Sequence, residues 1–423
     1  MHSATYRSLL RTPGAAAFFL SACAGRVGIA MTSLGLVWLV YDKTSSYAVA
    51  GVVTGAFAVA EAVCGPHLAR LLDRYGQTRA LPPMLAAHAA SVAALVTLVE
   101  SGAPVWATAL GGVLAGATIP QLGALSAARW SALLPDEASL PVAFSLESLG
   151  NSAGYLLGPA LVSAVGAGGH PVYGTVLAAA LIVGGGLALA AQRNTAPPPV
   201  TDAVERHRAG RSLLSPGFGV LVGVNVAIGV FFGAMRISVT AFAVERHAAA
   251  AAGPLFVLSS CAGLAAGWLY GLRRWPAAPR TQLAVVATGF AVCAVSLLAA
   301  STLIGMAFAL VVTEMAVPPT LVLCSVLARG AVRRAVLTQA FVWLNSASAA
   351  GTAAATVLAG RMTDRFGAHG GFAVAVVSIA VLAVFAAAGL RAFRARTAGE
   401  VAGTGAALAG DAGVPTGQDR TKS

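Results

Sequence analysis

Charged residues are scarce in this chain of 423 residues. Asp, Glu, Lys and Arg together make up 10% of it, whereas they make up about a quarter of a typical soluble domain. Hydrophobic residues make up 57%, and the mean hydropathy is +0.80. This balance excludes a soluble globular protein and predicts an integral membrane protein.

Cysteine is also rare, and the five copies do not indicate a disulfide framework or a metal site. All five lie inside apolar runs, without the spacing of paired metal ligands. The chain has no Gly-x4-Gly-Lys-Ser/Thr phosphate loop and no His-Glu-x-x-His zinc pair. No nucleophile, histidine and acid set falls in the apolar runs either. We therefore expect no cofactor, no metal and no enzymatic activity.

Long apolar runs are abundant and are separated by short polar breaks. A run of about 20 residues is enough for a helix to cross ~30 Å of hydrocarbon. Twelve such runs predict an all-α protein with twelve transmembrane helices. Their approximate bounds are 15–40, 46–68, 80–99, 105–128, 140–165, 171–191, 217–244, 251–272, 281–300, 302–327, 337–360 and 371–393.

Lys and Arg are unevenly divided between the two sides of this arrangement. If the chain starts in the cytoplasm, the cytoplasmic segments hold most of the 27 basic residues. The loops on the other side hold Lys43, Arg246, Arg361 and Arg365. The positive-inside rule then places both termini in the cytoplasm. It also explains the net charge of +12 without nucleic acid, because these residues face anionic lipid headgroups.

A proline-rich polar segment divides the chain into two halves. We expect a six-helix bundle at 1–191, a cytoplasmic linker at 192–216, a second six-helix bundle at 217–393 and a disordered cytoplasmic tail at 394–423.

An internal repeat supports this division. Gly51 and Gly65 in the second run recur at a constant offset as Gly253 and Gly267 in the eighth. Matches between the fifth and eleventh runs have a nearly equal offset. Two parallel halves related by an axis along the membrane normal are a known transporter architecture.

The polar turn between the second and third runs carries a recognisable pattern. Asp73, Arg74 and Gly76 resemble the loop between helices 2 and 3 of the major facilitator superfamily, and Arg79 completes the turn. The resemblance implies that Asp73 sits against the N-terminal end of helix 11, near 335–338, with Arg74 pairing nearby. These residues would hold the cytoplasmic side shut. A merely solvated loop carboxylate is the alternative.

The fifth run contains small residues on one helical face, at Gly150, Gly154 and Gly158, followed by Pro159. Such residues permit close helix approach. The pattern resembles the glycine-proline motif of the superfamily's antiporters, and a generic packing face is the alternative.

Further segments at 25–26, 31–36, 120–130, 143–147 and 337–345 resemble a branch of bacterial major facilitator permeases with poorly defined substrates. This resemblance implies the fold of that superfamily, in which helices 1, 4, 7 and 10 line a central cavity.

Charges at membrane depth are costly and are therefore functional candidates. Arg26, Arg236 and Glu314 fall in helices 1, 7 and 10, where they could recognise an anionic or zwitterionic substrate, and Glu314 could also take up a proton. A kink is expected one turn after Glu314, at Pro318 and Pro319. The alternative is a structural pair, with Arg236 and Glu314 as the partners. Glu61 is a second candidate for proton coupling.

Glu147 has a structural explanation, a salt bridge with Arg129 or with the Arg70 and Arg74 cluster.

These features favour a monomeric, multi-pass secondary transporter of the bacterial inner membrane that moves a small molecule by alternating access. The leading hypothesis is proton-coupled efflux of drug-like or secondary-metabolite compounds. One alternative is an importer or facilitator of a small organic anion, prompted by Arg26 and Arg236. Another is a membrane sensor or scaffold that transports nothing.

Overall fold

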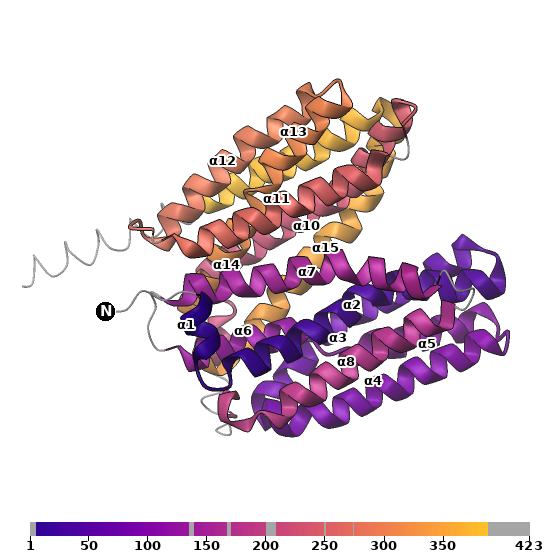
Figure 1. Ribbon diagram of the computed structural model, residues 1–423, viewed down its shortest axis with the longest axis vertical. Coiled ribbons are helices and arrows are strands. Elements are labelled where there is room, and N and C mark those ends of the chain that lie inside the picture. Colours follow the sequence, from indigo (N-terminus) through magenta and orange to yellow (C-terminus); the bar gives the residue numbers. More distant parts are fainter. Residues whose placement is uncertain are drawn as a thin grey trace, which may run out of the picture.

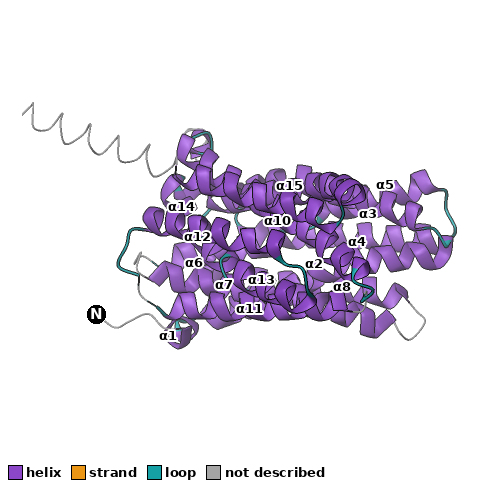
Figure 2. Cartoon of the chain, turned by 90° about the horizontal axis from the view of Figure 1, so that it is seen from above, coloured by secondary structure: helices purple, strands orange, loops and turns teal. Residues whose placement is uncertain are grey.

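A computed structural model describes residues 6–134, 139–166, 171–199, 209–248, 251–273 and 275–387. This part of the chain is almost entirely α-helical and contains no strand (Figure 2). The predicted tail at 394–423 and the middle of the predicted linker lie outside the described residues. The all-α expectation is confirmed for the part described.

Within the described residues, eleven helical spans are long and apolar enough to cross a membrane. Two of them, Val105–Leu133 and Leu303–Ala331, each combine two consecutive helices. The elements before the linker are α1 (Tyr6–Arg11), α2 (Ala15–Thr44), α3 (Tyr47–Tyr75), α4 (Gln77–Glu100), α5 (Val105–Thr118), α6 (Leu122–Leu133), α7 (Leu140–Gly166), α8 (Pro171–Ala191) and the 3-10 turn η2 (Arg193–Thr195). The later elements are α10 (Pro216–Glu245), α11 (Ala252–Leu272), α12 (Pro279–Ala299), α13 (Leu303–Glu314), α14 (Val317–Ala331), the 3-10 turn η4 (Arg334–Val336), α15 (Leu337–Phe366) and a last helix Ala368–Ala387.

The helix α7 has 27 residues but is not among the eleven spans. Its hydropathy is lowered by Glu147, by Asn151 and by its serines and glycines. Polar residues in a bundle helix are tolerated where they face protein, and α7 packs on α2 and α11.

The helices form two bundles that run along a common direction (Figures 1 and 2). The helices up to α8 make one bundle, and those from α10 onward make the other; we call them the N bundle and the C bundle. Figure 1 shows them meeting where α1, α6 and α14 lie and diverging toward the opposite end. We call the meeting end the closed end.

The polar turn between α3 and α4 is shorter than predicted. Helix α3 continues through Asp73 and Arg74 to Tyr75, and α4 begins at Gln77, so Arg79 is already helical. Gly76 alone reverses the chain, with φ 85° and ψ 145°. Residues with a Cβ are strained in that conformation by about 1 to 3 kcal/mol, which explains the glycine. The prediction that Asp73, Arg74, Gly76 and Arg79 together make the turn was therefore wrong in extent.

Helices 4 and 10 of the predicted set are each interrupted in mid-span. Pro120 separates α5 from α6, and α13 ends at Glu314 just before Pro318 and Pro319 in the first turn of α14. Proline lacks the backbone N–H that a continuous helix needs, and it is well suited to a first helical turn. The predicted break near Pro318 is confirmed.

The glycine face of α7 packs closely against α2. A Cβ built at Gly150 would lie 2.9 Å from Cys23 Sγ, and one at Gly158 would lie 2.8 Å from the Ala30 Cβ. At Gly154 the nearest atoms belong to the Arg26 backbone and Cβ, at 3.5 Å. The predicted close approach is confirmed, whereas a role of the motif in antiport remains a prediction.

The sequence repeat has a structural counterpart at Gly65 and Gly267. Gly65 of α3 faces Val342 of the C bundle, and a Cβ there would also reach Gln121 beside the first helix break. Gly267 of α11 faces Pro318 at the second break and also Leu149 of the N bundle. Each glycine thus lies where a helix of one bundle meets a helix of the other.

Arg129 holds together the N bundle at the closed end. Its guanidinium is fully buried and donates to Gln77 Oε1 at 2.8 Å and to the Leu189 carbonyl at 2.9 Å. It also donates to the Gln192 carbonyl and to Thr195 Oγ1, each at 2.8 Å. This one side chain of α6 therefore joins the start of α4, the end of α8 and the turn that follows α8.

We expect Arg129→Met to destabilise the protein by roughly 3 kcal/mol or more, because hydrogen bonds to a charged group contribute about 1.5 to 3 kcal/mol each and buried carbonyls lose their donor. Thermal melting in detergent measures the effect. Arg193→Met, which removes an exposed arginine from the neighbouring turn, is the control and should change little. Equal melting of the two variants would contradict this assignment.

Candidate functional site

Asp73 joins the two bundles at the closed end. The Gln339 backbone N–H, in the first turn of α15, donates to Asp73 Oδ2 at 3.3 Å, and the Thr338 side chain lies beside the same carboxylate. The N-terminal turn of a helix carries unpaired N–H groups and a partial positive charge, so a carboxylate is stabilised there. The predicted placement of Asp73 is confirmed. Its role as a gate remains a prediction.

Arg74 does not have the ion pair that was expected of it. None of the ion pairs in the described part of the chain involves Arg74. Its guanidinium lies over the Tyr75 ring, 4.9 Å from the centroid, and the side chain is exposed. The charge of this turn therefore faces the surroundings of the protein.

Two further contacts close the same end and were not predicted. Arg329 of α14 donates to the Leu134 carbonyl at 2.9 Å and to the Ser131 carbonyl at 3.4 Å, so it caps α6 from the other bundle. Tyr6 of α1 donates to the Trp268 carbonyl of α11 at 2.9 Å. Burial raises the pKa of Tyr6 to about 12, so the phenol stays protonated as a donor. From sequence, Arg329 was only one more basic loop residue.

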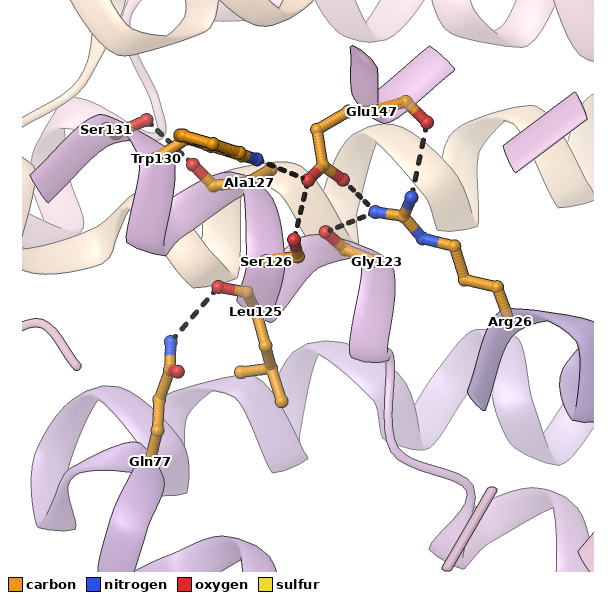
Figure 3. Close-up of polar contacts among 9 residues, drawn as sticks. All are labelled: Arg26, Gln77, Gly123, Leu125, Ser126, Ala127, Trp130, Ser131 and Glu147. Carbon is orange, nitrogen blue, oxygen red and sulfur yellow. Dashed lines mark hydrogen bonds and ion pairs between the residues drawn. The ribbon is translucent and has the colours of Figure 1, made fainter. Parts of the chain in front are cut away.

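Arg26 and Glu147 form a buried ion pair between α2 and α7 (Figure 3). Arg26 is 7% exposed and also donates to the Glu147 carbonyl at 3.2 Å and to the Gly123 carbonyl at 3.4 Å. The prediction that Glu147 pairs with Arg129, Arg70 or Arg74 was wrong. The interpretation of Arg26 as a structural charge is favoured, because its donors already have partners inside the N bundle.

The Glu147 carboxylate has its acceptor positions filled. Trp130 Nε1 and Ser126 Oγ both donate to Oε1, at 2.8 and 2.5 Å, while Oε2 faces Arg26 (Figure 3). Trp130 is fully buried and packs edge-on against Phe18, with ring centroids 4.8 Å apart. This network joins α2, α6 and α7 through a pair of charges that neutralise each other.

Glu61 lies beside the first helix break. Gln121 is the residue that precedes α6, and its Nε2 donates to Glu61 Oε1 at 2.7 Å. The carboxylate is partly exposed, and none of the ion pairs among the described residues involves it. Glu61 thus has a neutral partner at membrane depth, unlike Glu147.

Tyr155 of α7 is the site residue that the sequence analysis missed. Its hydroxyl lies within range of direct charge interaction with Glu61, with Arg236 of α10 and with Arg26. The side chain is 59% exposed near the middle of its helix. The sequence alone does not single out one tyrosine as a site residue. Tyr155 stands out only in the folded protein, where it lies within range of charged side chains from both bundles.

Arg236 and Glu314 do not form the structural pair that was considered. Arg236 is exposed and takes part in none of the ion pairs of the described residues. Glu314 is partly exposed at the end of α13, with its side chain against Gly263 of α11. Arg236 and Glu61 therefore each lie within range of a charge interaction with Tyr155, whereas Glu314 lies at the second helix break.

The sequence matches the family model of the Major Facilitator Superfamily over residues 17–341. The chain belongs to this superfamily. Its members are transporters rather than enzymes, and the eleven apolar spans agree with a multi-pass membrane protein. No curated protein sequence matches the chain.

Solved structures of other superfamily members share this fold. A bacterial homologue of the iron transporter ferroportin, outward-facing, has a TM-score of 0.72 at 12% identity, with 89% of this chain and 99% of that chain covered. The human organic anion transporter MFSD10 gives 0.68 at 15% identity, with 88% and 98% covered. FucP in the outward conformation gives 0.67 at 15%, with 88% and 98% covered.

We expect Arg26→Met to destabilise the fold by about 3 to 5 kcal/mol, because it leaves the buried Glu147 charge uncompensated. The double variant Arg26→Met with Glu147→Gln should recover part of this loss, since Gln still accepts from Ser126 and Trp130. Thermal melting of the single and double variants provides the measurement. Losses that simply add would contradict a coupled pair.

We expect Asp73→Asn to weaken the closed end, because the charge that interacts with the α15 dipole is removed, an interaction of about 0.3 to 2 kcal/mol. Spin labels at the exposed positions Arg193 and Arg333, on a cysteine-free background, would report a larger population of long distances across that end. Asp42→Asn, at an exposed carboxylate of α2, is the control. An unchanged distance distribution would contradict a latch at Asp73.

Proposed function

We propose that the protein is a secondary transporter of the bacterial inner membrane that moves a small molecule by alternating access, in exchange for protons. In this proposal α7 is the twelfth span, both termini are cytoplasmic, and the closed end faces the cytoplasm. The monomer contains the complete transport path between its two bundles.

The observation that carries the proposal is that a charged side chain from each bundle lies within range of a charge interaction with Tyr155 at membrane depth. Tyr155 and Glu61 come from the N bundle, and Arg236 comes from the C bundle. A charged group in the bilayer that lacks an opposite charge is stabilised by water or by a ligand. If a substrate contacts both bundles at once, its affinity depends on how the bundles are tilted relative to each other.

Glu61 and Glu314 are the proposed proton-binding groups. Each is partly exposed, and each lies beside a helix interruption. Neither shares in an ion pair of the described residues, so protonation would not leave a cation unpaired. Arg26 and Glu147 are unsuited to this task, because protonation of Glu147 would uncover a buried guanidinium.

Efflux is the proposed direction, with drug-like or secondary-metabolite compounds as substrates. It follows from the resemblance of the Gly150, Gly154, Gly158 and Pro159 face to the antiporter motif. The close packing of α7 on α2 gives this face a rigid geometry. A tilt of α7 would therefore carry α2 with it.

A small organic anion is a second candidate substrate, favoured by Arg236. Once Arg26 is neutralised by Glu147, Arg236 is the remaining cation near Tyr155 among the described residues. A carboxylate or sulfonate would supply the missing countercharge. Among proteins of the same fold are an organic anion transporter and a fucose:proton symporter, so both anions and proton coupling occur within it.

Proteoliposomes with a trapped pH-sensitive dye would test the function. Addition of a transported compound, from a panel that includes ethidium and benzoate, should cause proton movement. Glu314→Gln and Glu61→Gln should reduce that movement about tenfold or more, and Arg236→Gln should abolish benzoate movement if the anion is the substrate.

Glu100→Gln is the matched control, because Glu100 is exposed at the end of α4 that lies away from the closed end. This variant should behave like the unmodified protein. Counterflow without proton movement would instead indicate a facilitator. Ligand binding without any flux would support the sensor or scaffold alternative and contradict transport.

A further inference from the structure

A cavity lies outside the path between the bundles, at the closed end of the N bundle. Its volume is about 430 Å³, and it is formed by the last turn of α3, the first turns of α4 and the start of the linker. The residues that matter for its chemistry are Leu71, Pro83, Met84 and Pro199, which are apolar, and Arg74 and Arg79.

Among the described residues, the two arginines give this cavity a positive charge that no carboxylate pairs with. Both are exposed, and neither takes part in an ion pair of the described residues. The neighbouring carboxylate of Asp73 is turned away toward the Gln339 N–H and does not compensate them. Arg74 is held in place over the Tyr75 ring, which also lines the cavity.

The position of the cavity matches the boundary between lipid headgroups and acyl chains. Arg74 and Arg79 flank Gly76, where two membrane-spanning helices end and begin. Leu71, one turn deeper in α3, is 43% exposed and faces away from the protein core. One wall is therefore apolar at acyl-chain depth, and one edge is cationic at headgroup depth.

We propose that this cavity binds one anionic phospholipid, with its phosphodiester between Arg74 and Arg79 and an acyl chain against Leu71 and Met84. The assignment to the cytoplasmic leaflet rests on the orientation given under the proposed function. A free phosphate would use the arginines but not the apolar wall. A substrate on the transport path would have to contact both bundles, which this cavity does not join.

Native mass spectrometry of the detergent-purified full chain would test the site by titration with dioleoyl phosphatidylglycerol, dioleoyl phosphatidylcholine or inorganic phosphate. We expect one phosphatidylglycerol to bind at least tenfold more tightly than phosphatidylcholine, with little competition from phosphate. Arg74→Gln with Arg79→Gln should weaken it about 30-fold, from the usual contribution of basic residues near anionic lipid.

The matched control is Arg193→Gln with Arg273→Gln, which removes two exposed arginines that lie at the closed end but do not line the cavity. It should keep the tight site. A second variant, Ala80→Phe, fills the cavity without changing its charge and should also displace the lipid. It serves as the test if the arginine variant does not fold.

An equal loss in the control pair would overturn the proposal in favour of diffuse surface charge, and equal competition by phosphate would overturn it in favour of a free anion site. Binding is measured without transport, so a variant that loses lipid but still moves substrate separates this site from the transport function. Absence of flux with retained lipid binding would contradict only the proposed function.

Discussion

The cost of an uncompensated charge inside a bilayer organises the middle of this molecule. Arg26 meets that cost within the N bundle, through Glu147 and two backbone carbonyls. Glu147 in turn fills its remaining acceptor positions with the side chains of α6. Arg236 and Glu61 have no such compensation among the described residues, and they lie where the two bundles face each other. The same physical rule thus separates a pair of charges that holds the N bundle together from charges that have no countercharge among the described residues.

The two helix interruptions place polar chemistry at corresponding points of the two bundles. An interrupted helix leaves backbone groups unpaired, and the bilayer tolerates this only where protein or a water-filled cavity covers them. Gln121 at the first interruption binds Glu61, and Glu314 ends the helix at the second. Gly65 and Gly267 pack close to these points. The repeat in the sequence is therefore a repeat of local geometry, with an acidic side chain beside each interruption.

The sequence predicted those features that depend on neighbouring residues or on a familiar motif. Run lengths located the spans, prolines located the second interruption, and the pattern around Asp73 located its contact with α15. The sequence did not predict partners that are far apart along the chain. Arg26 and Glu147 are separated by 121 residues, and several other arginines were equally plausible partners for Glu147. Helical continuity through Asp73 to Tyr75 was also missed, because a polar segment resembles a loop although Gly76 alone makes the turn.

Helix α3 connects the proposed proton site to the closed end. Glu61 lies near its middle and binds Gln121 of its own bundle, whereas Asp73 lies in its last turn and binds the start of α15 in the other. In the proposed function, a change in the Glu61 contact would reach Asp73 through α3, which contains Pro66 between the two acids. Gly65, between the two acids, lets α3 lie close to Val342 of α15. In the proposed alternating-access cycle, close packing at this point would make the pair of helices a pivot. The charge state of Glu61 and the strength of the Asp73 contact would then bias the same motion.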